Sequence, residues 1–224
     1  MIKIEEVMTY GWEEAIRGMR NPMNSWDKSD TDWHYFGDDV DDPIDFIEWD
    51  EEDPYYFKTI GENDLSLMNR LSKAGNDHAK FLRMITVYMD ITAPLYWWKE
   101  FDTYKVGTVA NSCSTMHKIH AKEFTLDDFS HEHLDNVATS LLESVIGHLN
   151  LYRTIYIENK NKYDWWQMIQ LLPSSYNQKR TVMLNYQVLK NMYHSRKNHK
   201  LDEWHELCRV IEELPYSELI TGER

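Results

Sequence analysis

Cysteine is scarce in this 224-residue chain: there are only Cys113 and Cys208, far apart and outside any Cys-x-x-Cys pair. A small secreted protein held together by disulfides needs more cysteines, so that class is excluded. The chain also lacks an apolar run of about 20 residues, the length that a membrane helix needs. A basic start followed by an apolar stretch, which would indicate a signal peptide, is missing too. We therefore expect a cytoplasmic protein with reduced thiols and no membrane association.

Lysine and arginine are also few, at 24 against 38 aspartates and glutamates, and the formal net charge at pH 7 is −14. Such a surplus of negative charge repels the phosphates of nucleic acids. The densest basic stretch, residues 196–200, is short and is followed directly by Asp202 and Glu203. The composition excludes a nucleic-acid polymer as the main partner but is compatible with a single nucleotide.

Glycine and proline number only eight and six, whereas hydrophobic residues make up 42% of the chain and aromatic residues 13%. This balance excludes a disordered or fibrous protein and allows a sizeable core. A chain of this length supports one good core. We therefore expect a single domain over residues 1–224.

Several common functional motifs are absent. The sequence has no Gly-x-Gly-x-x-Gly turn, no Gly-Lys-Ser/Thr phosphate loop and no Gly-x-Ser-x-Gly nucleophile elbow. Its ten histidines include the close pairs His117/His120 and His131/His133. Such pairs arise by chance at this frequency, and no cysteine or carboxylate is spaced to join them. A metal site is therefore not expected.

Most of the negative charge lies in one segment, residues 24–56, which holds 13 acidic residues and one lysine. The segment has turn-forming residues, no helical periodicity and no calcium-loop spacing. Its aromatic side chains would pack it onto the body of the protein. We predict an ordered acidic surface loop inserted into the domain; its aromatic residues are Trp33, Tyr35, Phe36, Phe46, Trp49, Tyr55 and Tyr56.

The rest of the sequence is mainly helical in pattern. The longest apolar stripe, from Val137 to Leu149, predicts a core helix over residues 134–157. Pro173 ends the helix that we predict over residues 163–171, because proline cannot continue a helix. We predict further helices at 12–20, 63–73, 163–171, 184–194 and 201–213, and strands at 3–8, 104–109 and, ambiguous with helix, 81–91. These elements predict an α+β fold.

Residues 93–117 combine an aromatic-rich stretch with closely spaced hydroxyl and amide side chains. Such side chains can bind a phosphate or the polar edge of a ring. They equally cap the backbone of an ordinary loop, so the residue types alone do not decide between the two. The polar residues are Thr108, Asn111, Ser112, Ser114 and Thr115.

The order and spacing of this segment resemble the signature of the flavin-dependent thymidylate synthases. That signature runs Arg-His-Arg, then Ser, Asn and Ser-x-Arg, with a Gln three residues before the triplet and a His about 25 residues upstream. In this sequence Glu100 takes the Gln position, and Met116 replaces the final Arg. The remaining matches are His78 upstream, Thr103, Tyr104 and Lys105 at the triplet, and Asn111 and Ser114 after one inserted residue.

The C-terminal third carries the same resemblance. Leu172 and Pro173 match a Leu-Pro after a helix, and residues 185–189 resemble the family's Asn-Ala-Arg-Ser-Leu. Arg196 stands in place of the arginine that contacts and polarises the pyrimidine. Residues 202–206 resemble the Ala-Gln-Trp-Glu-Ile that follows, with one residue inserted. The resemblance covers the chain from Lys3 to its end, apart from the acidic insertion.

The resemblance implies a helix-flanked, mostly antiparallel sheet and a homotetramer that binds FAD between subunits. It also implies methylation of dUMP to dTMP, a step of nucleotide biosynthesis, with the carbon from methylenetetrahydrofolate and the flavin recharged by NADPH. By resemblance, Arg196 is catalytic and, with Glu100 and Ser114, binds the substrate. The cofactor-binding residues implied in the same way are His78, Tyr104, Lys105, Asn111, Asn185 and Gln187.

The departures from the pattern remove cationic groups. Arg-His-Arg becomes Thr-Tyr-Lys, and two further arginines become Met116 and Gln187. Methionine donates no hydrogen bond, and lysine acts only as a point charge. Three hypotheses follow: a flavoprotein methyltransferase acting on dUMP or a related pyrimidine nucleotide, an altered homologue serving as a nucleotide-binding or assembly protein, and an enzyme that transfers a one-carbon unit without the same reduction.

Overall fold

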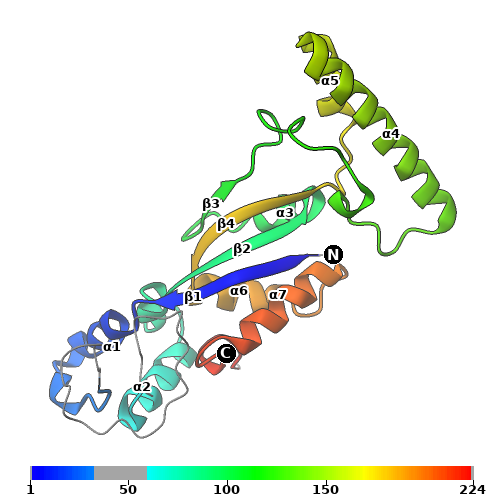
Figure 1. The fold of residues 1–224 in the computed structure, drawn as a ribbon. Coiled ribbons are helices and arrows are strands. Elements are labelled where there is room, and N and C mark those ends of the chain that lie inside the picture. Colours follow the sequence, from blue (N-terminus) through cyan, green and yellow to red (C-terminus); the bar gives the residue numbers. More distant parts are fainter. Residues whose placement is uncertain (1, 33–59, 223–224) are drawn as a thin grey trace, which may run out of the picture.

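The computed structural model describes residues 2–32 and 60–222. Its centre is a four-stranded antiparallel sheet with the strand order β1-β2-β4-β3, so the predicted α+β class with a mostly antiparallel sheet is confirmed. In Figure 1 the strands run side by side through the middle of the molecule. The strands are β1 Lys3–Tyr10, β2 Thr86–Pro94, β3 Val109–Ser112 and β4 Asn177–Asn185.

Helices pack against one face of this sheet. In β2 the side chains of Val87, Met89 and Ile91 are buried, whereas Tyr88 between them is exposed. This alternation is typical of an antiparallel sheet with one covered face. The helices are α1 Trp12–Arg20, α2 Glu62–Lys73, α3 Leu95–Phe101, α4 Asn136–Asn159, α5 Lys162–Leu171, α6 Tyr186–Arg196, α7 Asp202–Glu213 and α8 Glu218–Thr221. Four 3₁₀ turns, η1 Asn21–Met23, η2 Trp26–Lys28, η3 Ala79–Arg83 and η4 Leu126–Asp128, lie between them.

Aromatic side chains dominate the main core. Trp97 contacts Trp98, Phe101 and Trp204, with ring centroids 4.9, 5.1 and 4.9 Å apart. All four rings are fully buried. Each such ring removes a large apolar area from water. This cluster fixes the positions of α3 and α7 against the sheet, and both helices carry residues of the candidate site.

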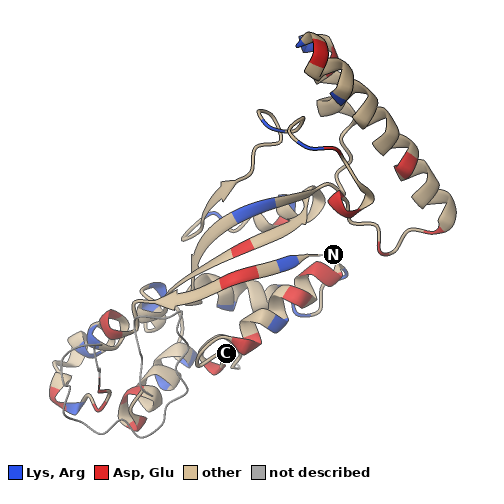
Figure 2. Ribbon diagram, viewed as in Figure 1, with Lys and Arg blue, Asp and Glu red and all other residues tan. Residues whose placement is uncertain are grey.

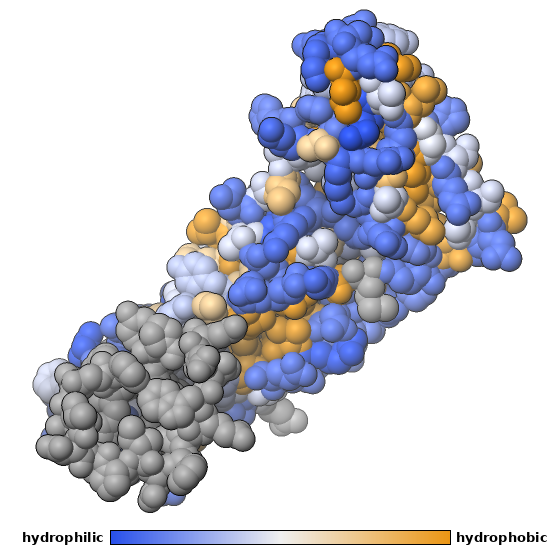
Figure 3. Space-filling model, viewed as in Figure 1, coloured by the Kyte–Doolittle hydropathy of each residue, from blue (hydrophilic) through white to orange (hydrophobic). Residues whose placement is uncertain are grey.

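A second, smaller core lies between α4, α5 and the loop that precedes α4. Figure 1 shows the α4–α5 hairpin projecting from one end of the sheet, with the loop beside it. The prediction of one buried stripe along α4 is wrong in part. Leu142, Ile146 and Leu149 are buried, but Val137 and Leu141 are 79% and 68% exposed. Hydrophobic residues therefore reach the surface along α4, as Figure 3 shows.

The structure confirms the predicted elements at 3–8, 12–20, 63–73, 163–171 and 201–213 within a few residues. The predicted strand at 104–109 is wrong except for its last residue: residues 104–108 form a loop with a turn at Gly107, whose φ is 77°, and Val109 begins β3. The predicted helix at 184–194 begins two residues later, since 184 and 185 end β4. The ambiguous stretch 81–91 contains both η3 and the start of β2.

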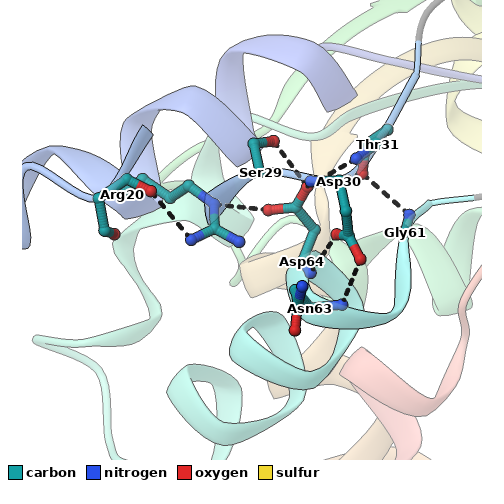
Figure 4. Close-up of polar contacts among 8 residues, drawn as sticks. Arg20, Ser29, Asp30, Thr31, Gly61, Asn63 and Asp64 are labelled. Atoms are coloured by element: carbon teal, nitrogen blue, oxygen red, sulfur yellow. Dashed lines mark hydrogen bonds and ion pairs between the residues drawn. The ribbon is translucent and has the colours of Figure 1, made fainter. Parts of the chain in front are cut away.

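A buried ion pair joins the end of α1 to α2, and its carboxylate also holds the start of the acidic segment. Arg20 Nε lies 2.6 Å from Asp64 Oδ1, and both side chains are almost inaccessible, at 4% and 0%. The other Asp64 oxygen accepts hydrogen bonds from Ser29 and from the backbone and hydroxyl of Thr31 (Figure 4). Burial alone would raise the pKa of the Asp64 carboxyl, but these hydrogen bonds and Arg20 hold it below its ordinary value.

Asp30 completes this attachment by capping α2 from a distance. Its carboxylate accepts from the backbone nitrogens of Asn63 and Asp64 at 2.8 and 3.0 Å, which the local cap residue Gly61 cannot do. A Cβ at Gly61 would lie 2.3 Å from the Asp30 carboxylate, so only glycine fits. The predicted acidic loop continues beyond residue 32, and its aromatic residues lie outside the described residues.

Candidate functional site

The guanidinium of Arg196, at the C-terminal end of α6, is held by two aromatic rings and a carboxylate. Its central carbon lies 4.7 Å from the Trp204 ring centroid and 5.6 Å from that of Tyr104. Nε donates to the Tyr104 hydroxyl at 3.0 Å, and Nη1 donates to Glu100 Oε2 at 2.8 Å. Nη2 makes no hydrogen bond within the described part of the chain. One end of a rigidly positioned donor is therefore available to a ligand.

Glu100, on α3, is the centre of this group. The same Oε2 atom also accepts from Trp204 Nε1 at 3.0 Å and lies 3.3 Å from His199 Nε2. His199 Nδ1 accepts from the Leu201 backbone, so Nε2 is the ring nitrogen that faces Glu100. Three elements thus meet at one carboxylate: α3, the end of α6 with the turn after it, and α7. We call Arg196, Glu100, Tyr104, His199 and Trp204 the arginine cluster.

The electrostatics of the arginine cluster are nearly balanced. The Arg196 side chain is 19% exposed and the Glu100 side chain 36%, so the pair is only partly shielded from water. The carboxylate neutralises the guanidinium charge that an anionic ligand would otherwise meet. A glutamine at this position, as in the family pattern, would accept the same hydrogen bonds without that neutralisation.

The turn between α3 and β3 lies against the start of α6. A Cβ on Gly107 would come within 2.9 Å of Asn185 Nδ2 and 3.2 Å of Val188 Cγ2. Asn185 Oδ1 caps α6 by accepting from the Val188 backbone at 3.0 Å. Glycine at position 107 therefore lets the turn lie directly against the side chains of Asn185 and Val188.

Two buried polar atoms, one on α6 and one in this turn, have no hydrogen-bond partner among the described residues. Gln187 is 6% exposed; its amide nitrogen approaches Asn191 Oδ1 at 3.4 Å, but its Oε1 is unpaired. The hydroxyl of Thr108 is likewise buried and unpaired. A buried polar group without a hydrogen bond costs free energy, so such atoms are natural contacts for a bound ligand.

The other predicted site residues are not brought to the arginine cluster within this chain. Lys105 is exposed on the turn, and Asn111 is exposed on β3, opposite Thr181. Ser114 accepts from the backbone nitrogens of Met116 and His117, so it caps its own turn. His78 is exposed at the start of η3. Among the described residues, none of these four forms a hydrogen bond or an ion pair with Arg196 or Glu100.

The structure adds Trp204 and His199 to the predicted set. The motif at 202–206 contains the tryptophan, but a sequence match gives no indication that its ring carries a guanidinium. His199 lies in the short basic stretch that looked like ordinary surface. Only the folded chain shows that the turn after α6 brings this histidine back to Glu100.

No protein-family model and no curated protein matches the sequence. Solved structures do match. The thymidylate synthase X (ThyX) of Helicobacter pylori with FAD and dUMP has a TM-score of 0.66 and 14% identity, over 100% of this chain and 98% of that chain. The fold is that of the flavin-dependent thymidylate synthases. A second structure of ThyX from Helicobacter pylori, complexed with FAD and dUMP, gives a TM-score of 0.64 and 15% identity over 98% of each chain.

The flavin-dependent thymidylate synthase fold confirms the architecture that the resemblance implies. It does not test the individual site residues, whose roles stay predictions. None of the helices in residues 2–32 and 60–222 combines the length and apolar character that spanning a membrane requires. Within the same residues no three histidine, cysteine or carboxylate side chains gather as metal ligands would.

Proposed function

We propose that this protein is a flavin-dependent enzyme that methylates a pyrimidine deoxynucleotide, dUMP or a close variant, with methylenetetrahydrofolate as carbon donor. The observation that carries the proposal is the arginine cluster on this fold. Its guanidinium is fixed in orientation and keeps one free donor end, as recognition of a pyrimidine carbonyl requires. Proteins of the same fold are crystallised with FAD and dUMP, which supports the choice of ligands.

The residues beside the α3–β3 turn fit a flavin cofactor. The unpaired Gln187 Oε1 and Thr108 hydroxyl, the amide nitrogen of Asn185 and the ammonium of Lys105 offer the acceptors and donors that FAD needs. When bound, FAD in its reduced form supplies the hydride for the reductive methylation and is recharged by NADPH. Tyr104 offers an aromatic ring at the same turn.

Within this proposal each residue of the arginine cluster has a physical task. Arg196 Nη2 donates to the pyrimidine carbonyl and stabilises negative charge that develops on the ring. Trp204 and Tyr104 hold the guanidinium in one plane, which lowers the entropy cost of binding. Glu100 fixes the position of Nη1. Ser114 would bind the substrate, as the resemblance implies.

The separation of the predicted residues supports a homotetramer. His78 and Asn111 are exposed and lie apart from the arginine cluster in one chain. A site formed between subunits would bring such residues together from different copies. We propose that FAD binds at such an interface, with His78 and Asn111 contributed by neighbouring protomers.

The first test is the visible absorption spectrum of the purified protein, before and after addition of FAD and dialysis. A retained flavin band is expected. The second test is release of tritium from [5-³H]dUMP with reduced flavin and methylenetetrahydrofolate. Bound flavin with dUMP-dependent release would support the proposal. A colourless protein that does not take up FAD would contradict it.

The alternative is an altered homologue that binds a nucleotide or assembles without catalysis. Two observations favour it: Glu100 neutralises Arg196, and Met116 stands where the pattern has an arginine. Under this alternative the protein binds dUMP but shows no tritium release, whether or not it retains flavin. The two assays together therefore separate the hypotheses.

A further inference from the structure

A pocket of about 290 Å³ lies between the tip of the α4–α5 hairpin and the loop before α4. The loop contributes Met116, His117 and His120. The loop is joined to the hairpin by a hydrogen bond from Trp165 Nε1 to the Met116 carbonyl at 3.0 Å and by a bond from Arg153 to the His120 carbonyl at 3.1 Å. The walls of the pocket are therefore fixed relative to each other.

Cationic side chains converge on this pocket in a chain whose net charge is −14. Lys160 and Lys162 line it from the hairpin tip. Figure 2 shows lysine or arginine at the tip and along the facing loop. No aspartate or glutamate is among the described residues that line the pocket. Neither lysine forms an ion pair in the described part of the chain, so their charges are uncompensated there.

The side chain of His120 also lies in surroundings with a surplus of positive charge. Its ring packs edge-on against Tyr156, with centroids 4.9 Å apart, and its Nδ1 is buried without a hydrogen-bond partner. Burial lowers the pKa of His120, and the charges of Lys160, Lys118 and Arg153 lower it further. An imidazole nitrogen lacking a partner, close to several cations, has the surroundings that an anion would complete.

The chemistry of the lining selects the kind of ligand. Lysine ammonium groups repel a metal ion, and the pocket offers no carboxylate to hold one. Two carboxylates lie near these lysines in the sequence, and neither lines the pocket: Asp164 is buried and accepts from Asn159, and Glu158 is exposed. Two lysines beside two histidines suit a dianionic group with several acceptor oxygens.

We propose that this hairpin pocket binds the phosphoryl group of a small-molecule ligand through Lys160, Lys162 and His120. Met116, the residue that replaces the arginine of Ser-x-Arg, itself lines the pocket. The hairpin lysines therefore supply positive charge next to the position where the family pattern has lost it. The inference rests on the proposed function only in naming a nucleotide as the natural carrier of the phosphoryl group.

Isothermal titration of the full-length, flavin-free protein tests this proposal, with inorganic pyrophosphate, dUMP and sodium acetate as ligands at equal ionic strength. Saturable binding of pyrophosphate or dUMP, with none of acetate, is expected. Lys160→Asn and Lys162→Gln should each weaken binding about tenfold, the loss typical of one charge-assisted hydrogen bond. Asparagine is chosen at position 160 because that residue has a φ of 54°, which asparagine tolerates.

The matched control is Lys122→Gln, which removes one positive charge from the same loop. Lys122 is paired with Asp128 and does not line the pocket. The affinity of Lys122→Gln for pyrophosphate and dUMP should stay within twofold of the wild type. If this variant lost as much affinity as Lys160→Asn and Lys162→Gln, the effect would be one of overall charge, and the proposal would be wrong. Binding of dUMP alone, weakened in both lysine variants, would support the site and identify a nucleotide as the carrier.

Arg196→Met separates this site from the arginine cluster. The hairpin pocket should still bind pyrophosphate in that variant, whether or not the protein takes up flavin. If Arg196→Met abolished binding and the two lysine variants did not, the phosphoryl group would be bound at the arginine cluster and the proposal would be wrong. Absence of saturable binding of either phosphoryl ligand at millimolar concentration would overturn it as well.

Discussion

Two arginine–carboxylate pairs in this protein have opposite surroundings. Arg20 and Asp64 are almost fully buried, and both Asp64 oxygens have partners. Arg196 and Glu100 are partly exposed, and the guanidinium keeps a free end. The first pair joins the end of α1 to α2, whereas the second pair is open to solvent. The same two functional groups are therefore fully enclosed in one place and, in the other, leave a donor open for the recognition that we propose.

The difference lies in how much of each group is satisfied by the protein. Breaking a fully buried pair leaves an uncompensated charge in a low-dielectric interior. Breaking a partly exposed pair lets water take the place of the lost partner, so the stability cost is small. Substitutions in the two pairs should consequently separate effects on folding from effects on ligand binding.

The largest expected effect is on stability, in Asp64→Asn. This change leaves the Arg20 charge buried without its partner, and we expect the free energy of unfolding to fall by about 3 kcal/mol. Urea denaturation followed by circular dichroism measures it. The matched control is Asp27→Asn, an exposed carboxylate on η2, which should change stability by less than about 0.5 kcal/mol. Equal small changes in both variants would contradict a structural role for the buried pair.

A part of the same free energy should depend on pH. The folded-state pKa of Asp64 is lowered, so its contribution is fully present above the unfolded pKa of about 3.9 and is lost as pH falls through the folded value. The stability difference between the wild type and Asp64→Asn should therefore be constant from pH 7 to about 5 and narrow below about 4. Denaturation series at those pH values check this. A stability difference between the two proteins that grew as the pH fell would contradict a lowered pKa of Asp64.

Arg196→Ala should change recognition more than folding. We expect nucleotide affinity to fall at least about tenfold and nucleotide-dependent activity to disappear, with a stability loss of about 1 kcal/mol. Arg180→Ala is the matched control: Arg180 lies 4.1 Å from the Trp98 ring centroid and pairs with Asp102, but is not assigned to the nucleotide. Dissociation constants for dUMP measure the change in affinity, and thermal melts of the same variants measure the change in stability. Unchanged affinity and turnover in Arg196→Ala would remove the basis for the substrate assignment.

The smallest effect is expected in Glu100→Gln, in which the affinity for the nucleotide should increase. Glutamine still accepts from Trp204 and Arg196 but no longer neutralises the guanidinium. Affinity for dUMP should rise about threefold, with stability changed by less than about 1 kcal/mol. Titration of dUMP into the variant, compared with Asp102→Asn as a carboxylate control, measures the gain. A weaker complex would indicate that the Glu100 charge itself contributes to binding.

The resemblance assigned Glu100 and Arg196 to the substrate and Tyr104 to the cofactor, and the structure brings all three into contact, although their roles stay predictions. Sequence reasoning missed β4 because the strand begins with five polar residues, and its two buried apolar residues, Val182 and Leu184, come only near the end. It missed α3 because its tryptophans are also typical of strands. Tertiary packing, not local pattern, fixes both elements.

The predicted strand at 104–109 failed for a different reason. Gly107 adopts a positive φ, which an L-residue rarely adopts, so the chain turns where alternation of apolar residues indicated extension. The joining of His199 to Glu100 could not be read from the sequence either, because it depends on the direction of the turn after α6. Some predicted site residues, such as His78, do not contact the arginine cluster in the described part of the chain. These residues were assigned to the site only because they match positions of the family signature.

The attachment of Asp30 and Thr31 to α2 has a consequence for protein engineering. Thr31 Oγ1 accepts from the Gly61 backbone at 3.0 Å, so the two ends of the intervening segment are held together by the body itself. Lengthening a loop whose ends are already fixed costs little, about 0.6 kcal/mol for each doubling. A reporter domain or an affinity tag inserted between these two ends, and not at the junction itself, should therefore leave the sheet and both arginine pairs unchanged.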